Sequence, residues 1–333
     1  MDRQWNDKIF NVAEAGFETL ALEIFEFQYE RNAVYRAFCD ALGRNPQTVT
    51  SLASIPFLPV GFFKTHVITT TAFQPAVVFE SSGTTGMVNS RHLVRDTGIY
   101  EESFEKGFER VYGPVKDLVI IGLLPSYLER ANSSLVYMVD KLIARSRKPD
   151  SGFYLHNTDK LAATLQRLEL EKKRSVLIGV TFALLDFAGS FPMPLAHCMI
   201  METGGMKGRR QEMIRAEVQS ILQHAFTLSS VHSEYGMTEL LSQAYSTGGG
   251  RFNCPPWMKV LIREEEDPLS IRLSPPPGAA VISGAVNIID LANIYSCSFI
   301  ATDDAAKMYS DGRFEILGRL DNSDLRGCSL LTI

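Results

Sequence analysis

Apolar residues near the start of the chain recur at helical spacing. Residues 7–28 place phenylalanine, alanine, leucine and isoleucine on one face, which predicts an amphipathic helix. A second helix is predicted over residues 34–42, because Gly43 can end it and Pro46 follows. Residues 55–59 read Ile-Pro-Phe-Leu-Pro, and the two prolines predict an extended connector. The chain is therefore expected to begin with helices and to continue in an extended form.

Short apolar runs follow, with helical patterns between them. Such runs are typical of strands that are buried on both faces of a parallel sheet. One of the helical patterns extends from Ile214 to Ala225. The alternation predicts a layered α/β fold with parallel strands. The runs predicted to be strands are residues 118–124, 175–180, 198–201 and 228–231.

The pattern changes near Gly248-Gly249-Gly250. Short strand candidates are separated there by Asp-Pro, Pro-Pro-Pro-Gly and Asp-Gly turns, which predicts a small antiparallel sheet or half-barrel. We therefore expect a helical N-terminus and α/β core over residues 1–250, a small β-rich subdomain over 251–317, and a hinge-like tail over 318–333. The strand candidates are residues 259–263, 270–273, 280–283, 287–289 and 313–317.

Composition excludes several classes of protein. The formal net charge of −5, with 33 scattered Lys and Arg residues, argues against a nucleic-acid-binding protein, which would carry a basic stripe. Five cysteines occur without a Cys-x-x-Cys pair, which disfavours a zinc site or a disulfide framework and predicts a cytoplasmic protein. The N-terminus lacks a signal-peptide pattern and no apolar run is long enough to cross a bilayer, so no membrane insertion is expected.

A loop of small and hydroxylated residues directly follows the strand-like run at positions 77–79. Glycines let the backbone approach a ligand, successive N–H groups can form an anion-binding nest, and hydroxyls add donors for phosphate oxygens. The chain contains no Gly-Lys pair, so this is not the common P-loop. An ordinary surface turn is the alternative interpretation. The loop consists of Ser81, Ser82, Gly83, Thr84, Thr85 and Gly86.

Three later segments also carry candidate ligand-binding groups. The stretch from Ser233 to Glu239 places Tyr235 and Gly236 where a flat base could stack, and Thr238 and Glu239 where phosphate and Mg²⁺ could bind. A helix N-terminus, with Thr238 as its cap, explains the same residues. Asp304 follows a strand-like run and could accept both hydroxyls of a ribose, although Asp-rich turns are common. Arg319 and Cys328 lie in the last segment.

The order of these four segments resembles the adenylate-forming enzymes, which include acyl-CoA synthetases and firefly luciferase. The ending Asp-Asn-Ser-Asp-Leu-Arg-Gly-Cys most resembles the LuxE-type acyl-protein synthetases, and the Ile-Pro-Phe-Leu-Pro segment is also similar to phenylacetate–CoA ligases. The resemblance spans roughly residues 55–333. It implies the layered α/β architecture of the adenylate-forming N-terminal domain, with ATP and Mg²⁺ as cofactors.

The resemblance also implies residue roles. The loop of residues 81–86 would hold the β- and γ-phosphates of ATP. Thr238 would contact the α-phosphate, and Glu239 would bind Mg²⁺. Asp304 would bind the ribose hydroxyls with Arg319 beside it. The adenine side would be formed by Gly204, Gly205, Tyr235 and Gly236.

Two features depart from the resembling enzymes. Their phosphate loop continues with Pro-Lys-Gly, whereas this chain has Val88-Asn89-Ser90, so a phosphate-binding lysine is missing. Arg91, His92 or Lys207 are candidates to replace it. The chain ends at Ile333, and the resemblance therefore predicts that it lacks the mobile C-terminal domain of similar CoA ligases, with its catalytic lysine.

Cys328 is the candidate acyl acceptor. Arg326 lies two residues away and would favour the thiolate, which can attack an acyl-adenylate to give a thioester. The predicted activity is ATP-dependent activation of a carboxylic acid, most simply a fatty acid, followed by transfer through Cys328 to a partner acyl reductase. Transfer to CoA or to a carrier protein is one alternative. A degenerate module that binds a nucleotide or a partner without turnover is the other.

Overall fold

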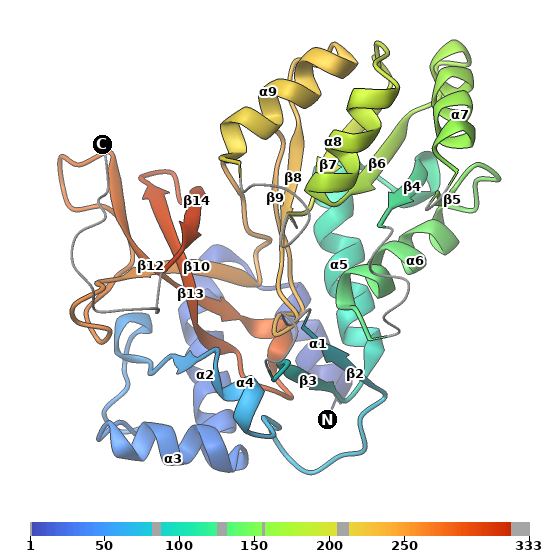
Figure 1. The fold of residues 1–333 in the computed structure, drawn as a ribbon. Coiled ribbons are helices and arrows are strands. Elements are labelled where there is room, and N and C mark those ends of the chain that lie inside the picture. The colour runs from blue at the N-terminus through green and yellow to red at the C-terminus, as the bar shows by residue number, and fades with distance from the viewer. Residues whose placement is uncertain (1, 82–87, 125–131, 155–156, 205–212, 321–333) are drawn as a thin grey trace.

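A computed structural model describes residues 2–81, 88–124, 132–154, 157–204 and 213–320 of the chain. Two six-stranded sheets and a two-stranded hairpin form its framework, with helices around them (Figure 1). Among the described residues, no helix combines the length and the apolar character needed to cross a membrane.

The first sheet is parallel except at one edge. Strands β4, β6 and β7 pair in parallel, as the apolar runs predict. Strand β8 also pairs in parallel with β7, and β9 returns antiparallel to β8. In spatial order the strands are β5 (Gly152–Phe153), β4 (Val119–Leu123), β6 (Ser175–Gly179), β7 (Cys198–Glu202), β8 (His232–Tyr235) and β9 (Ala244–Ser246).

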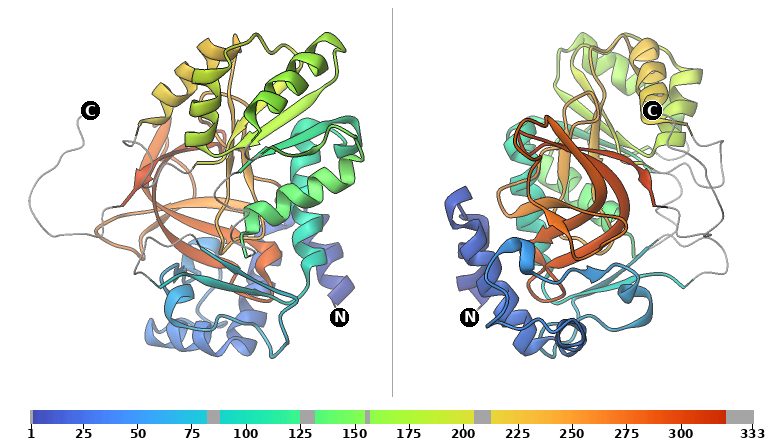
Figure 2. Two further views of the ribbon diagram at one scale, coloured as in Figure 1. Left: turned by 45° about the vertical axis from the view of Figure 1, so that its right-hand side comes forward. Right: turned by 90° about the vertical axis from the view of Figure 1, so that its left-hand side faces the viewer.

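Helices cover both faces of this sheet (Figures 1 and 2). Gly122 faces Val139 of α6, whereas Gly179, one step along the neighbouring strand, faces Leu184 of α8. Adjacent positions in a strand point to opposite faces, so these two helices lie on opposite sides. The helices are α5 (Thr97–Tyr112), α6 (Ser134–Ser146), α7 (Thr158–Leu170), α8 (Thr181–Ser190) and α9 (Arg215–Phe226), with the short 3₁₀ helix η3 (Val115–Asp117) before β4.

The second sheet contains the strands of the C-terminal third of the chain. All its pairs are antiparallel except β1 with β13. The division of the chain near residue 250 remains a prediction. In spatial order the strands are β1 (Leu58–Pro59), β13 (Phe299–Tyr309), β12 (Val281–Asp290), β10 (Met258–Arg263) and β11 (Ile271–Arg272), and β14 (Phe314–Arg319) also pairs with β13.

The N-terminal helices pack on the second sheet (Figure 1). Gln28 of α2 donates to the backbone carbonyls of Asn293 and Ile294, and Asn32 donates to that of Ser296. These helices therefore hold the turn between β12 and β13. The remaining elements are α1 (Asp2–Phe10), η1 (Glu14–Gly16), α2 (Phe17–Arg31), α3 (Ala33–Ala41), η2 (Leu52–Ser54), α4 (Phe62–Thr65), η4 (Leu291–Asn293) and the hairpin strands β2 (Val77–Glu80) and β3 (Arg91–Val94).

Four local predictions are wrong. The separate strands predicted over residues 280–283 and 287–289 are one strand, β12. The single helix over residues 7–28 is divided into α1 and α2, separated by an extended Ala13 and by η1. The strand predicted over residues 228–231 lies four positions later, as β8, whose polar residues are covered by tertiary contacts. Asp304 lies within the long strand β13, where it pairs with Arg319, rather than after a strand end. In each case tertiary contacts outweigh local preference.

A buried carboxylate joins the two sheets. Asp290, at the end of β12, accepts hydrogen bonds from the backbone N–H groups of Leu241, Ser242 and Ala292, at 2.8, 2.9 and 3.1 Å, and from the Ser242 hydroxyl at 2.6 Å. Burial raises the pKa of Asp290 to about 6 although these four donors oppose the shift. The carboxylate is therefore ionised at neutral pH and fully hydrogen-bonded.

The same network reaches α5. The Ser242 hydroxyl lies 3.0 Å from that of Ser103, which accepts a 2.9 Å hydrogen bond from the indole of Trp257. All three side chains are buried. The segment after β8 is thus held by the second sheet on one side and by α5 on the other.

We predict that Asp290→Asn lowers the free energy of unfolding by about 3 kcal/mol, because the amide group would point donors at backbone donors and leave buried N–H groups unpaired. Chemical denaturation at pH 7 measures the change. The exposed Asp140→Asn on α6 serves as the control, with an expected change within about 0.5 kcal/mol. Equal unfolding free energies for the two variants would contradict the assigned role of Asp290.

Candidate active site

The two sheets meet at Tyr235, the last residue of β8. Its phenol donates a 2.8 Å hydrogen bond to the carboxylate of Asp304 on β13. The ring packs against Phe252 and Phe314, with centroid distances of 5.9 and 5.5 Å. Tyr235 and Asp304, which are 69 positions apart in sequence, therefore lie side by side.

Arg319 completes this corner of the site. It is the cross-strand partner of Asp304, and its guanidinium lies 3.4 Å from the carboxylate of Asp303. Burial raises the pKa of Asp304, while the Tyr235 hydrogen bond and the charge of Arg319 oppose the shift. This corner thus places the carboxylates of Asp303 and Asp304, which can accept hydrogen bonds, beside the exposed guanidinium of Arg319.

Glu239 lies in the turn that follows β8 and is only 5% exposed. Burial raises the pKa of its carboxyl group. A hydrogen bond from the Ser90 hydroxyl acts in the opposite direction, as do the positive charges of Arg319 and Lys64. The sequence predicts Glu239, but it gives no signal that Ser90 would lie beside it.

Two side chains hold the backbone of this turn. The Nδ1 of His92, on β3, lies 2.8 Å from the carbonyl oxygen of Thr238. The Nδ2 of Asn293, in η4, donates a 2.7 Å hydrogen bond to the carbonyl oxygen of Glu239. A carbonyl accepts and does not donate, so His92 carries its proton on Nδ1. The two carbonyls are thus fixed by different elements.

The β2–β3 hairpin brings the start of the hydroxyl-rich loop to Glu239. The hydroxyl of Ser81 accepts from the backbone N–H of Ser90 at 2.9 Å, and the N–H of Ser81 donates to the Ser90 carbonyl at 3.1 Å. Ser90 is therefore bonded both to the loop and to Glu239. Five predicted residues lie outside the described residues, namely Ser82, Gly83, Thr84, Thr85 and Gly86.

Gly204 follows the end of β7 with a φ of +78°, a conformation that favours glycine. Its N–H donates a 2.7 Å hydrogen bond to the carboxylate of Glu202. Gly236, also predicted, is exposed in the turn after Tyr235. Gly205 and Cys328 lie outside the described residues.

A second pair of carboxyl groups was not predicted. Glu202 ends β7 and Glu234 lies on β8, and burial together with the charge of Glu202 raises the pKa of Glu234 to about 8. A Cβ atom on Gly236 would lie 2.4 Å from a Glu234 carboxyl oxygen. A larger residue at position 236 would therefore displace the Glu234 carboxyl group. In the sequence, these residues belong to the polar stretch His-Ser-Glu-Tyr, which does not have the apolar pattern of a buried strand.

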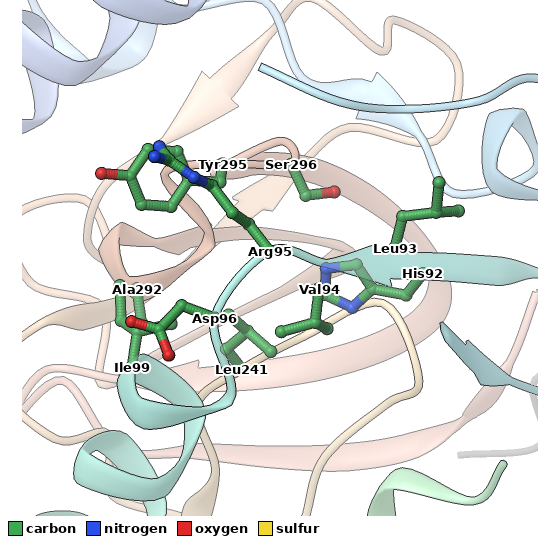
Figure 3. Close-up of a pocket in the computed structure, with 10 residues that line it drawn as sticks. All are labelled: His92, Leu93, Val94, Arg95, Asp96, Ile99, Leu241, Ala292, Tyr295 and Ser296. Carbon is green, nitrogen blue, oxygen red and sulfur yellow. The ribbon is translucent and has the colours of Figure 1, made fainter. Parts of the chain in front are cut away.

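A small cavity lies beside β3, lined by His92, Arg95, Asp96, Leu241 and Tyr295 among others (Figure 3). The guanidinium of Arg95 stacks over the Tyr295 ring, 4.4 Å from its centroid. The cavity volume of about 10 Å³ has room for roughly one water molecule and none for an organic acid.

Comparison with protein families decides the class of enzyme. The family model described as "Acyl-protein synthetase, LuxE" matches residues 10–332. The chain belongs to the LuxE family of acyl-protein synthetases. As a LuxE family member it is an enzyme of the acid–thiol ligase class.

Two characterised relatives extend over most of this LuxE family chain. The long-chain-fatty-acid–luciferin-component ligase of Aliivibrio fischeri is 24% identical over 354 residues, covering 94% of this chain and 86% of the relative. The protein of the same name from Vibrio harveyi is 22% identical over 338 residues, covering 92% and 84%.

Solved structures share the fold of this LuxE family chain. A 2-hydroxyisobutyryl-CoA ligase in complex with 2-HIB-AMP and CoA aligns with a TM-score of 0.66 at 13% identity, over 93% of this chain and 70% of the ligase. ATP-bound MatB from Rhodopseudomonas palustris aligns with a TM-score of 0.55 at 16% identity, over 85% of this chain and 56% of MatB. The layered adenylate-forming architecture expected from the sequence is confirmed.

We predict that His92→Leu lowers the free energy of unfolding by about 2 kcal/mol, because the Thr238 carbonyl loses its buried donor. His92→Asn retains a donor near the position of Nδ1 and should cost less. Denaturation of the wild-type protein and both variants at pH 7 measures the difference. A larger loss for asparagine than for leucine would refute the role assigned to the hydrogen bond.

The stability of the wild-type protein should also depend on pH through His92. Burial lowers the pKa of His92 from 6.5 to about 4. The unfolded chain therefore binds the proton more tightly, and the stabilisation present above pH 6.5 is lost as the pH falls toward 4. The difference in unfolding free energy between wild type and His92→Asn should shrink over this range. A difference in unfolding free energy that stays constant over this pH range would contradict the lowered pKa of His92.

Proposed function

We propose that this LuxE family enzyme activates a carboxylic acid with ATP at the junction of the two sheets. The observation that carries the proposal is the convergence of Tyr235 and Asp304, which join the two sheets through a hydrogen bond, with Glu239 in the turn after Tyr235 and within the influence of the Arg319 charge. A buried tyrosine hydrogen-bonded to a half-buried aspartate, beside a buried glutamate, suits a nucleotide with its metal ion.

In the first half-reaction, a carboxylate oxygen of the acid attacks the α-phosphorus of ATP. The new P–O bond gives an acyl-adenylate, and the bond to the β-phosphate oxygen breaks to release pyrophosphate. This chemistry depends on positioning and on stabilisation of charge rather than on proton transfer. The enzyme must also exclude water from the product, because an acyl-adenylate hydrolyses readily.

The nucleoside would lie against the Tyr235 corner. Asp304 would accept hydrogen bonds from the ribose hydroxyls, and its bond to Tyr235 would fix the carboxylate. Arg319, the cross-strand partner of Asp304, would lie beside them. Gly204, Gly205 and Gly236 would allow the adenine close to the backbone, and Thr238 would contact the α-phosphate.

The donor set fits Mg²⁺ held together with phosphate oxygens. Mg²⁺ is typically bound by one or two carboxylates plus substrate phosphates, and Glu239 supplies one such carboxylate. When bound, Mg²⁺ would neutralise charge on the triphosphate. Glu239 is well suited to bind it, because Ser90, His92 and Asn293 fix its side chain and its backbone segment. The loop of Ser81, Ser82, Gly83, Thr84, Thr85 and Gly86 would contact the β- and γ-phosphates.

In the second half-reaction, a thiolate sulfur would attack the acyl carbonyl carbon, forming a thioester and releasing AMP. Cys328 is the proposed nucleophile. Burial raises the pKa of Cys39, Cys198 and Cys254 to about 12, and raises that of Cys297 also. These four thiols are therefore protonated at neutral pH and poorly reactive, which leaves Cys328 as the fifth cysteine of the chain.

The names of the relatives support a long-chain fatty acid as substrate and a luciferin component as the second partner of the ligation. A partner acyl reductase is the proposed recipient of the acyl group. Transfer to CoA or to a carrier protein is the alternative fate of the same adenylate. A module without turnover is the remaining alternative. Pyrophosphate release with a panel of carboxylic acids separates catalysis from binding alone.

We predict that Glu239→Gln lowers acid-dependent pyrophosphate release by about 100-fold or more, because the Mg²⁺ ligand and its charge are lost. Release is measured with saturating fatty acid over a range of Mg²⁺ concentrations. Glu171→Gln, in an exposed position after α7, is the matched control and should retain wild-type rates. Wild-type rates in Glu239→Gln would exclude Glu239 as the metal ligand.

We predict that Cys328→Ser releases pyrophosphate normally but does not retain radiolabelled fatty acid on the protein in the presence of ATP, since serine does not form the thioester. Cys254→Ser is the control and should be labelled like the wild type. Undiminished labelling of Cys328→Ser would end the self-acylation proposal while leaving the adenylation step intact.

A further inference from the structure

The structure gives His92 a role other than that of the lysine missing at Asn89. The residue is 1% exposed, and burial lowers its pKa to about 4, so it is neutral at pH 7 and supplies no positive charge. Of the other two candidates, Arg91 extends toward Glu80, its cross-strand partner, at 3.7 Å. Lys207 lies outside the described residues. The contribution of His92 must therefore come from its hydrogen bonds.

The two ring nitrogens of His92 have different surroundings. Nδ1 carries the proton and donates to the carbonyl oxygen of Thr238 at 2.8 Å. Nε2 therefore has a lone pair that can only accept a hydrogen bond. This atom is buried, and no residue in the described ranges donates to it. A buried acceptor without a donor is costly, so Nε2 needs a partner from elsewhere.

His92 lies in the wall of the small cavity beside β3. Figure 3 shows its ring directed toward the other side chains that line this cavity. The volume of about 10 Å³ has room for roughly one water molecule, which needs about two to four polar partners. Ser296 also lines the cavity and offers a second partner. Among the described residues, its hydroxyl makes a single long hydrogen bond, of 3.4 Å to the carbonyl oxygen of Ile68.

The lining also determines what kind of molecule can fill the cavity. The lone pair of Nε2 attracts a hydrogen-bond donor and repels an anion. The guanidinium of Arg95, which stacks over the Tyr295 ring at 4.4 Å from its centroid, disfavours a cation in the same cavity. The neutral donor that fits this volume is water.

We propose that the cavity binds one water molecule, which donates a hydrogen bond to Nε2 of His92 and thereby positions Thr238. In a neutral imidazole, the hydrogen bond made by one nitrogen determines whether the other carries the proton. Water that donates to Nε2 keeps the proton on Nδ1, where it holds the Thr238 carbonyl. His92 is thus a positioning residue, whose ring and water act together on the turn after β8. The link to catalysis rests on the proposed contact of Thr238 with the α-phosphate.

The location of the cavity suits a water molecule. Its wall includes Val94 of β3, Ile99 of α5, Leu241 of the turn after β8 and Ala292 of η4. Close packing is difficult where four elements meet, and a water molecule can form hydrogen bonds in several directions at once. It would join the ring of His92 to the turn between β12 and β13.

Nuclear magnetic resonance on isotope-labelled histidine tests the water directly. The chain has six histidines, and the ring signals that disappear in His92→Asn belong to His92. We expect the Nδ1–H tautomer and a nitrogen chemical shift of Nε2 typical of a hydrogen-bonded acceptor. We also expect a nuclear Overhauser effect between a long-lived water molecule and the ring protons beside Nε2.

A variant that fills the cavity shows what the water does. Val94 is buried and lines the cavity, so Val94→Ile adds a methyl group of about the size of a water molecule there. It should abolish the water signal, shift Nε2 toward the value of a nitrogen without a hydrogen bond, and lower kcat for pyrophosphate release by about 10-fold, the effect of one lost hydrogen bond. Val94→Ala leaves the space open and should keep the water signal. Val111→Ile, at an exposed position of α5, is the matched control and should behave like the wild type.

The outcomes are distinct. No water signal at His92 in the wild-type protein overturns the inference, as does a signal that persists unchanged in Val94→Ile. Loss of the water with an unchanged kcat refutes the positioning role. A missing water signal in Val94→Ala or Val111→Ile also counts against the inference, because neither change fills the cavity. If Val94→Ile does not fold, the spectra of the wild type and Val94→Ala still decide whether the water is bound.

The same measurements separate this inference from the proposed function. If the wild type shows the bound water but releases no pyrophosphate with any acid, the proposed function fails while the water site stands on the resonance data.

Discussion

The segment that follows β8 is held in place by hydrogen bonds from several distant parts of the chain. His92 holds the carbonyl of Thr238, Asn293 holds that of Glu239, and Asp290 accepts from the two backbone N–H groups that follow. The donors and the acceptor come from β3, η4 and β12. A turn fixed from three directions keeps the buried Glu239 carboxylate in one position, as the proposed binding of Mg²⁺ and phosphate requires.

Much of the fold could be predicted from the sequence, because its signals are local. The apolar runs at 118–124, 175–180 and 198–201 match β4, β6 and β7 closely, since strands buried on both faces need continuous apolar residues. The sequence prediction placed β8 four residues too early, because the residues of β8 are polar and are covered by aromatic side chains from distant segments. The position of Asp304 inside β13 depends on pairing with β14, which no local pattern reports.

The residues of the candidate site also divide into those that the sequence could predict and those that it could not. Tyr235, Glu239 and Asp304 could be identified because short motifs mark them, and the structure brings them together. Ser90 and Asn293 could not, because each acts on Glu239 through a contact between segments far apart in the sequence. Their residue types are ordinary in loops and short helices, so only the tertiary arrangement distinguishes them.

The bonds from Gln28 to the turn before β13 have a consequence for synthesis of the protein. They join positions 265 residues or more apart, and the same turn contains Asn293, which contacts Glu239. Contacts of such long range form late, because the intervening chain must be ordered first. During translation, the first helices must therefore wait for nearly the whole polypeptide to leave the ribosome before this junction can close, and the nascent chain stays inactive until then.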